Sequence, residues 1–459
     1  MIGKIIQPEL EAFIASRDFS GLQAVFKEML VPDIAEVIED IKPTDRAVLF
    51  RLLPKQIALE TFEYLDGTAQ RELLAELGKA EVVSLLDEMH PDDRTALLED
   101  LPGTIARDLI GSLSPDERRV AQALLGYPEN SIGRLMTPEY LAVRPETTIA
   151  AVMENLRKHG RDSETFDVIY IVNTRGVLLD DVRLRELLLA PPEVSIGSIA
   201  DGIVVSLNVT EDREASIQMF QRYGRTALPV VDKEGVLIGI VTVDDALAVA
   251  QEEHTEDIHK FGGLEAVETP YAATPLLTLV WKRAGWLVVL FLGEMLTATA
   301  MGYFENEIAR AVVLALFVPL IISSGGNSGS QAATLIIRAM ALEEIRLADW
   351  WRVMRRELLS GLILGLILGS IGFLRIAVWS AFSPIYGEHW LLVGLTVSGS
   401  LVGVVMWGTL SGSMLPFLLR ALGADPAASS APFVATLVDV TGLVIYFSVA
   451  SFILAGTLL

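Results

Sequence analysis

The sequence predicts a multi-domain membrane protein: an N-terminal α-helical repeat (superhelix) domain, an α/β tandem module, a connecting helix and an all-α transmembrane domain of five helices. Three observations predict this order. A 24-residue helical repeat fills the N-terminal part, a strand-turn-strand-helix pattern then occurs twice, and long apolar runs follow residue 280. The expected domain boundaries are residues 1–130, 131–250, 251–280 and 281–459.

The motif Pro-x-Asp/Glu-Arg marks the helical repeat. It starts at residues 43, 91 and 115, and Gly67-Thr-Ala-Gln70 fills the missing slot, so the four starts are 24 residues apart. Proline followed by acids suits a helix N-terminus and its dipole. We therefore expect short helices stacked in a small α-solenoid. Within it, Asp92 and Asp93 are candidate metal ligands that face the next module.

Apolar strands broken by glycine turns form the tandem module. Val168–Val172 before Gly176 aligns with Ala227–Val231 before Gly235, at an offset of 59 residues. Helical periodicity precedes each copy, at residues 149–159 and 213–223. Two copies of one β-turn-β-α unit are therefore expected.

This duplication, over roughly residues 131–250, resembles a tandem CBS (Bateman) module, a family that senses adenine nucleotides or ions. The resemblance implies a ribose contact through a Thr-x-x-Asp element at a helix start. Thr242 and Asp245 match that element, which makes ATP a candidate ligand, whereas the first copy has Arg183 and Glu186 instead. A helix N-cap at Thr242 explains the same motif without a nucleotide.

Four acids crowd the helix predicted between this module and the membrane: Glu252, Glu253, Glu256 and Asp257. Like charges at helical spacing cost about 0.2–0.5 kcal/mol per pair. A divalent cation such as Mg²⁺ would relieve the repulsion, and its binding and loss would hold and release the helix. An ordinary solvated acidic face is the alternative.

Hydropathy predicts five membrane crossings, because apolar runs after residue 280 reach the roughly 20 residues that span a bilayer. The predicted spans are Ala284–Tyr303, Ile308–Ser324, Leu358–Phe382, Trp390–Leu419 and Phe433–Leu459. The first ten residues lack an extended apolar segment, so no cleaved secretory signal is expected.

Basic residues indicate the orientation of these spans. Lys282 and Arg283 precede the first span and five arginines follow the second, whereas the connections after the first and third spans have no Lys or Arg. Because positive residues remain on the cytoplasmic side, this predicts a multi-pass protein of the cell (inner) membrane. Its N-terminus is expected in the cytoplasm and its C-terminus outside.

Charge and composition restrict the partners. The whole formal net charge of −23 comes from residues 1–280, because the rest contains ten basic and ten acidic residues. This excess opposes binding to nucleic acid and favours cations, although solubility alone is an equal explanation. With no cysteine and five scattered histidines, a bound metal is expected to be a hard, oxygen-seeking ion.

Polar residues inside the apolar runs are the strongest functional signal. Asp439 lies in the last span, and an intramembrane carboxylate costs about 2.5–3.5 kcal/mol on insertion scales, so it is expected to bind an ion. Ala435 and Thr436 share its helical face and are candidate pore-lining residues. Glu294 is a second intramembrane acid, which either lines the path or anchors the first span.

A second polar motif, Gly-Gly-Asn-Ser-Gly-Ser-Gln at residues 325–331, follows the second predicted span. Polar or irregular backbone at membrane depth is tolerated only inside protein or beside a water-filled cavity. Asn327 and Gln331 are therefore candidate pore-lining residues. Close helix packing explains the glycines equally well, but it does not explain the two amides.

Together, GGNSGSQ, FVATLVDVTG and TEDIHK, the acidic helical repeats and the CBS pair make the chain resemble the MgtE family of magnesium channels. The resemblance implies a homodimer in the lipid bilayer, with spans two and five around the pore and Asp439 binding hydrated Mg²⁺. It also implies closure by cytosolic Mg²⁺ at acids that map onto Asp245, Glu253 and Glu256. Another family acid corresponds to Ala248 here, and family asparagines near the pore correspond to Ser330 and Ala431.

Three classes of function remain to be compared. A Mg²⁺ channel would be driven inward by the membrane potential, at about 4.6 kcal/mol per 100 mV for a doubly charged ion. A proton- or sodium-coupled divalent cation carrier is the alternative that the sequence does not separate from it. A membrane-anchored sensor would not need polar residues in the bilayer, and no catalytic constellation or phosphate-binding loop supports an enzyme.

Overall fold

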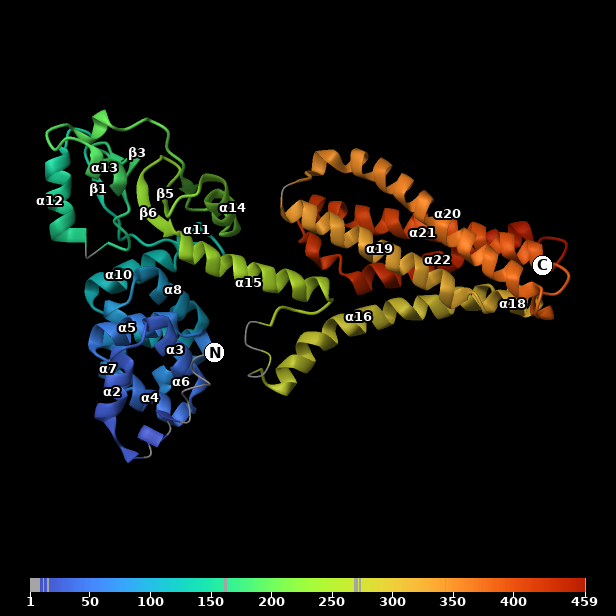
Figure 1. The fold of residues 1–459 in the computed structure, drawn as a ribbon, viewed down its shortest axis with the longest axis horizontal. Coiled ribbons are helices and arrows are strands. Elements are labelled where there is room, and N and C mark those ends of the chain that lie inside the picture. The colour runs from blue at the N-terminus through green and yellow to red at the C-terminus, as the bar shows by residue number, and fades with distance from the viewer. Residues whose placement is uncertain are drawn as a thin grey trace. The chain divides into compact units, whose positions relative to one another are not determined.

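The computed structural model describes residues 9–458 except 11, 15, 161–162, 268–270, 272–273 and 343. It divides into two compact units, residues 1–251 and 252–459, and the boundary falls within one long helix. Figure 1 shows the order of the elements along the chain.

The first unit begins with a regular series of short helices. They are α2 (Phe19–Lys27), α3 (Val31–Asp40), α4 (Pro43–Leu52), α5 (Lys55–Tyr64), α6 (Gly67–Glu76), α7 (Lys79–Glu88), α8 (Pro91–Asp100), α9 (Gly103–Ser112) and α10 (Pro115–Leu124). From α3 onwards every helix has ten residues and starts 12 residues after the one before it. The 24-residue repeat is therefore a pair of helices, and α4, α6, α8 and α10 begin at the four predicted starts.

The last residue of the motif explains its recurrence. The side chains of Gln70, Arg94 and Arg118 each donate a hydrogen bond to the backbone carbonyl eight residues earlier, at 2.8, 2.9 and 3.1 Å. These carbonyls lie near the C-terminus of the preceding helix, where intrahelical donors are missing. The motif thus starts one helix and caps the helix before it.

The tandem module has two three-stranded sheets with the same topology. The first contains β1 (Ala142–Val143), β2 (Val168–Val172) and β3 (Leu178–Arg183), and the second contains β4 (Leu207–Asn208), β5 (Ala227–Val231) and β6 (Leu237–Thr242). In each sheet the first pair is parallel and the second antiparallel. The accompanying helices are α11 (Ile132–Leu135), α12 (Ile149–His159), α13 (Leu184–Leu189) and α14 (Glu214–Tyr223).

The two copies meet through their hairpin turns. Leu178 N–H donates to the Gly235 carbonyl and Leu237 N–H donates to the Gly176 carbonyl, both at 3.0 Å. Gly176 and Gly235 have φ values of +81° and +78°, which L side chains rarely adopt, so both turns require glycine. The symmetric contact is consistent with the duplication predicted from the sequence.

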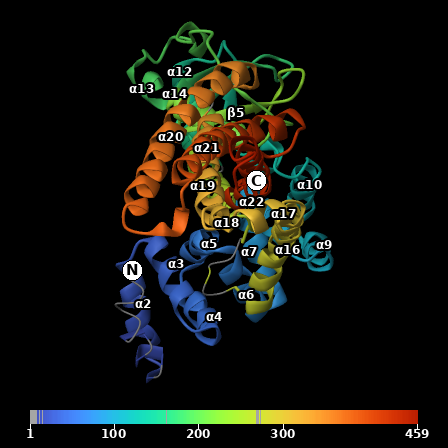
Figure 2. The same ribbon diagram turned by 90° about the vertical axis from the view of Figure 1, so that its right-hand side faces the viewer.

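The second unit contains the helices that are long and apolar enough to cross a membrane. Its elements are the C-terminal part of α15 (Val243–Phe261), then α16 (Leu276–Tyr303), α17 (Glu305–Arg310), α18 (Val312–Ala315), α19 (Val318–Ala341), α20 (Trp350–Ser380), α21 (Trp390–Ala421) and α22 (Ala431–Ile453). Five candidate spans are found among the described residues, as predicted. Helices α19, α20, α21 and α22 form one bundle in both views (Figure 1 and Figure 2).

The second predicted span has the wrong bounds. Ile308–Ser324 is not one helix, because the chain breaks between α17, α18 and α19, and α19 then continues to Ala341. The motif at residues 325–331 therefore lies inside a regular helix rather than in irregular backbone. The hydropathy reading ended the span too early because glycine, serine and amide residues lower the local hydropathy without breaking a helix that is packed against its neighbours.

Candidate functional site

Glycines of α19 let three membrane helices approach one another closely. A Cβ added to Gly408 or Gly412 of α21 would lie 2.3 or 2.1 Å from the carbonyl oxygen of Gly325 or Gly329 of α19. No side chain fits at those distances, so the two backbones are in direct contact, as in small-residue packing of membrane helices. Ser328 Oγ lies 2.6 Å from Thr409 Oγ1 within the same contact.

The glycine-rich motif of α19, residues 325–331, also contacts α22 near Asp439. A Cβ added to Gly326 would lie 3.4 Å from Ala435 Cα and 3.7 Å from Asp439 Oδ1. Gly326 thus leaves the Asp439 carboxylate next to bare backbone of α19. The two polar motifs of the sequence, 109 residues apart by count from Gly326 to Ala435, face each other.

Asp439 also has an acidic neighbour. Its carboxyl group and that of Glu294 on α16 are close enough to share a hydrogen bond. On the same side, Thr436 lies against Gly293, where an added Cβ would stand 2.7 Å from Thr436 Cγ2. Two carboxyl groups in contact require a proton or a cation between them.

The two amides predicted to line a pore do not lie beside Asp439 in the single chain. Asn327 and Gln331 share one face of α19, and both are exposed in the single chain, whereas Gly325, Ser328 and Gly329 on other faces are buried. The structure therefore joins Ala435, Thr436 and Asp439 with Gly326, and leaves the amides on an open face.

The acidic residues of α15 lie near the start of α22. Lys260 Nζ pairs with Glu256 Oε1 at 2.5 Å and with Asp425 Oδ2, before α22, at 2.6 Å. Burial, and next the nearby Asp425 carboxylate, raise the pKa of Asp257. Lys260 thus supplies part of the positive charge that the acidic helix needs, one turn beyond the acids themselves.

Residues of α16 and α19 contact the start of α22 close to the end of α15. Trp286 Nε1 of α16 donates to Ser430 Oγ at 3.1 Å, and an added Cβ at Gly263 would overlap the Trp286 ring at 2.5 Å. Ser330 Oγ donates to the Ala431 carbonyl at 3.2 Å. The end of α15 is thereby connected to the start of α22. Glu252 and Glu253 lie about one turn before Glu256 on α15.

In the first unit, the predicted ligands Asp92, Asp93 and Asp245 come together with Glu164, which the sequence reading did not single out. We call these four residues the acid cluster. Asp92 and Asp93 are in the first turn of α8 and Asp245 is in the first turn of α15. Their carboxylates repel one another and Glu164.

Burial dominates the electrostatics of the acid cluster. It raises the pKa of Asp92 well above its usual range, that of Asp93 to about 8 and that of Asp245 to about 6, with neighbouring carboxylates adding to the effect for all three. Asp92 is only 8% exposed, and among the described residues none donates a hydrogen bond to its Oδ1. A buried carboxylate oxygen without a donor is a ready ligand for a hard cation.

The nucleotide motif shares one residue with this cluster. Thr242 Oγ1 donates a hydrogen bond to the Asp245 carboxylate, three residues later at the start of α15. The Asp245 carboxylate also accepts a hydrogen bond from the backbone N–H of Thr242, as the third residue of a helix does in one half of a capping box. Asp245 is thus directed to Thr242 and to the acid cluster.

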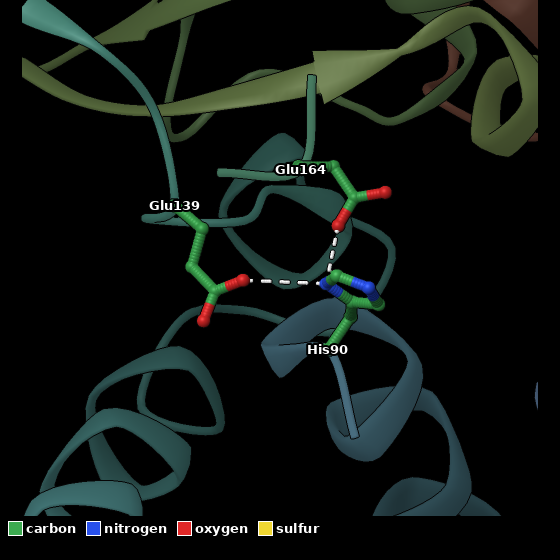
Figure 3. A group of neighbouring side chains, drawn as sticks. All are labelled: His90, Glu139 and Glu164. Atoms are coloured by element: carbon green, nitrogen blue, oxygen red, sulfur yellow. Dashed lines mark hydrogen bonds and ion pairs between the residues drawn. The ribbon is translucent and has the colours of Figure 1, made fainter. Parts of the chain in front are cut away.

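A histidine lies beside the acid cluster (Figure 3). His90 Nδ1 is 2.7 Å from Glu164 Oε2 and 3.2 Å from Glu139 Oε2. The donor atoms of these three residues lie within 4.8 Å of one another. The sequence reading missed them because the residues are 49 and 25 positions apart, with no common motif.

Comparison with known proteins agrees with this architecture. Family models match the chain as a divalent cation transporter domain (MgtE) at residues 318–449, an MgtE intracellular N domain at 29–130, and CBS domains at 132–193 and 196–252. The magnesium transporter MgtE of Thermus thermophilus is 39% identical over 97% of this chain and 98% of its own length. That of Enterococcus faecalis is 31% identical over 95% of each chain.

Solved structures of soluble domains are also similar. The cytosolic domain of the Mg²⁺ channel MgtE in complex with ATP has a TM-score of 0.50 and 34% identity, and the match covers 52% of this chain and 98% of that one. The soluble part of a magnesium transporter matches with a TM-score of 0.51 at 24% identity, covering 55% of this chain and 99% of that one, which supports the fold. With near-complete coverage of curated relatives, the chain belongs to the MgtE family of magnesium transporters.

Proposed function

We propose that this protein is a homodimeric channel that moves Mg²⁺ down its electrochemical gradient into the cytosol and that cytosolic Mg²⁺ closes it. The observation that carries the proposal is the approach of Gly326 to Asp439, because it sets a carboxylate beside a helix that has no side chain at that level. Mg²⁺ keeps most of its water and binds through one or two carboxylates. A carboxylate that adjoins backbone with no side chain between them suits such a ligand.

The exposed amides support a dimer. Asn327 and Gln331 face outwards from α19 in the single chain, at a level where lipid offers no hydrogen bond. A second copy would cover them and supply a second Asp439, so that two carboxylates approach one ion along a twofold axis. In this arrangement α19 and α22 of both copies line the path, with Ala435 and Thr436 beside Asp439.

The acid cluster is the proposed regulatory site. Asp92, Asp93 and Asp245 come from the helical repeat domain and from the first turn of α15, so a bound Mg²⁺ would tie the start of α15 to the repeat domain. The acids Glu252, Glu253, Glu256 and Asp257 on the same helix are further proposed ligands. The N-terminus and the regulatory domains are proposed to lie in the cytoplasm, where they would bind cytosolic Mg²⁺.

ATP is a second proposed regulator. A solved MgtE cytosolic domain contains ATP, and Thr242 and Asp245 match the ribose-binding element of CBS modules. Because Asp245 also belongs to the acid cluster, ATP and Mg²⁺ would act on the same helix start. Equilibrium binding of ATP to the full chain with and without Mg²⁺ tests this, and identical lack of binding in both conditions contradicts it.

Flux measurements test the proposed transport. Full-length protein is reconstituted in liposomes that contain a fluorescent Mg²⁺ indicator, and uptake is driven by an imposed membrane potential. We expect Asp439→Ala to reduce Mg²⁺ uptake at least tenfold, whereas Glu388→Gln, an exposed loop acid, leaves it unchanged. Native uptake with unchanged selectivity in Asp439→Ala would overturn the proposal.

The coupled carrier remains the competing function, and the contact between Glu294 and Asp439 favours it specifically, because a shared proton is what such a carrier exchanges. Glu294→Gln separates the two. A channel conducts with this variant and shows single-channel currents without any proton gradient. Strict dependence of wild-type uptake on a proton gradient, lost in Glu294→Gln, would establish the carrier instead.

A further inference from the structure

The proposed Mg²⁺ function does not use the imidazole of His90. Two carboxylates converge on one ring nitrogen, Nδ1, with Glu164 Oε2 at 2.7 Å and Glu139 Oε2 at 3.2 Å (Figure 3). His90 belongs to the helical repeat domain, immediately before α8, while both glutamates belong to the first CBS copy. The group therefore bridges two domains of the first unit.

Backbone hydrogen bonds hold these three residues in place. His90 N–H donates to Glu63 Oε1 at 3.2 Å, and Glu164 N–H donates to the Glu139 carbonyl at 3.0 Å. Thr137, two residues before Glu139, exchanges two backbone hydrogen bonds of 2.9 Å with Ile240 of β6. The donor atoms thus stand on fixed backbone, as a metal site requires.

The spacing of the donor atoms matches that of metal ligands. Metal–nitrogen and metal–oxygen bonds of about 2.0–2.2 Å place neighbouring ligand atoms about 2.9–3.4 Å apart in octahedral or tetrahedral geometry. The two observed separations, 3.2 and 2.7 Å, are within a few tenths of an ångström of that range. A metal ion can replace the proton on Nδ1 with only small movements of the glutamates.

The donor set selects a class of ion. Mg²⁺ prefers oxygen ligands, whereas imidazole nitrogen suits Zn²⁺ and its neighbours in the transition series. One nitrogen and two carboxylate oxygens leave a fourth position for water, which is a usual arrangement for zinc. Next to the group, the buried Asp92 Oδ1 accepts no hydrogen bond from the described residues, so a nearby cation would be a favourable neighbour for this oxygen.

We propose that His90 Nδ1, Glu139 and Glu164 bind a divalent transition-metal ion, best Zn²⁺, which links the helical repeat domain to the first CBS copy. This goes beyond the proposed function, since it assigns a second kind of ion and a ligand set that shares only Glu164 with the acid cluster. As a consequence, a transition-metal ion at a concentration far below that of cytosolic Mg²⁺ would link the helical repeat domain to the CBS module.

Nδ1 is the ring atom that both carboxylates approach, so an ion bound there would contact His90, Glu139 and Glu164 together. A ring nitrogen that binds a metal carries no proton, so the ion occupies the position between the nitrogen and the two carboxylates. Coordination through imidazole nitrogen is therefore the signature that distinguishes this site from sites built from oxygen ligands alone.

The test measures Zn²⁺ binding by the full-length protein in detergent micelles. Excess Mg²⁺ fills the oxygen-only sites, and calorimetric titration with Zn²⁺ then gives the stoichiometry. We expect one Zn²⁺ per chain. X-ray absorption at the zinc edge of the wild-type complex should show the multiple-scattering pattern of a single imidazole ligand.

Variants identify the ligands. His90→Gln and Glu164→Gln should each weaken Zn²⁺ binding at least tenfold, whereas His159→Gln, an exposed histidine on α12, should bind as the wild type does. If His90→Gln is poorly folded, the absorption spectrum of the wild type still decides. Absence of Zn²⁺ uptake in excess Mg²⁺, a spectrum without imidazole, or equal binding by folded His90→Gln would each overturn the proposal, and none of these results bears on Mg²⁺ flux through Asp439.

Discussion

Lys260 Nζ, in the last turn of α15, lies 2.6 Å from Asp425 Oδ2, 165 residues later in the connection between α21 and α22. This ion pair connects α15 to the segment that leads into α22, the helix of Asp439. Both side chains are about one-third exposed, at 33% and 38%. The pair therefore contributes little to the free energy of unfolding. Its structural effect is to hold the end of α15 next to the connection between α21 and α22.

Removing this pair should change gating more than folding. Pairs of this exposure contribute about 0.2–1 kcal/mol, so Lys260→Met and Asp425→Asn should each shift the Mg²⁺ concentration for half-maximal closure by roughly two- to fivefold. Liposome flux at a series of internal Mg²⁺ concentrations measures the shift. In a double-mutant cycle the two effects should not add, and full additivity would show that the pair does not act as a unit.

The contact between α19 and α21 should tolerate no side chain at Gly412. An added Cβ would stand 2.1 Å from the Gly329 carbonyl oxygen, so Gly412→Ala must separate the two helices. Overpacking of this kind costs about 1–3 kcal/mol or more. Gly399→Ala on the same helix is the matched control, because its Cβ would meet nothing nearer than Val449 Cγ1 at 3.8 Å.

Thermal unfolding in detergent, followed by size-exclusion chromatography, measures both variants. Gly412→Ala should lose several degrees of apparent Tm or fail to give a monodisperse peak, while Gly399→Ala elutes as the wild type does. Equal Tm values for the two variants would contradict the close approach of the helices.

Asp92→Asn should make the Tm of the protein depend less on Mg²⁺. The substitution replaces a buried carboxyl group, whose charged form is disfavoured by burial and by neighbouring carboxylates and whose Oδ1 accepts no hydrogen bond from the described residues, by a neutral amide. The Mg²⁺-free protein should therefore become more stable at pH values at which the carboxyl group of the wild type is charged. The increase in Tm on adding Mg²⁺ should shrink, because a proposed ligand is gone. Asp116→Asn is the control, since Asp116 has the same position in the next repeat but its side chain is 83% exposed.

Melting curves with and without Mg²⁺ check both statements. Protease sensitivity offers a second readout, because ion-bridged domains should be protected by Mg²⁺ in the wild type and in Asp116→Asn but less in Asp92→Asn. A full Mg²⁺ response in Asp92→Asn would remove this residue from the regulatory site.

Mg²⁺ should stabilise the soluble domains more at pH 8 than at pH 6. The pKa values of Asp93 and Asp245 are raised to about 8 and about 6, so at pH 6 these groups retain protons that Mg²⁺ has to displace. Because their folded pKa lies above the unfolded value, the Mg²⁺-free fold loses stability as pH rises through that range, and Mg²⁺ restores it. Titration should give at least tenfold weaker Mg²⁺ binding at pH 6.

The same titration with Asp93→Asn is the check on this assignment. Removing Asp93, whose pKa is raised to about 8, should flatten the dependence of Mg²⁺ binding on pH between pH 6 and pH 8, since one fewer proton is exchanged. An unchanged pH profile in this variant would mean that other carboxyl groups bind the ion.

Local sequence patterns were sufficient to predict most of the helices and strands of the fold. Proline and acids at residues 43, 91 and 115 predicted helix starts that the structure has at those positions, and the 59-residue offset predicted strands β2 and β5 with their actual bounds. These signals are local, because a helix start needs only its first turn and a strand needs only its own alternation or apolar run. The end of the second span was wrong, since glycines continue a helix when another helix covers them.

Consecutive residues and repeated spacings were enough to predict the family, the domain order, the five apolar helices and the intramembrane Asp439. That Gly326 faces Asp439, that Glu294 adjoins it and that His90 meets Glu139 and Glu164 became visible only in the folded chain. Such contacts join segments tens to hundreds of residues apart. Their geometry depends on how helices and sheets pack, and no local periodicity records it.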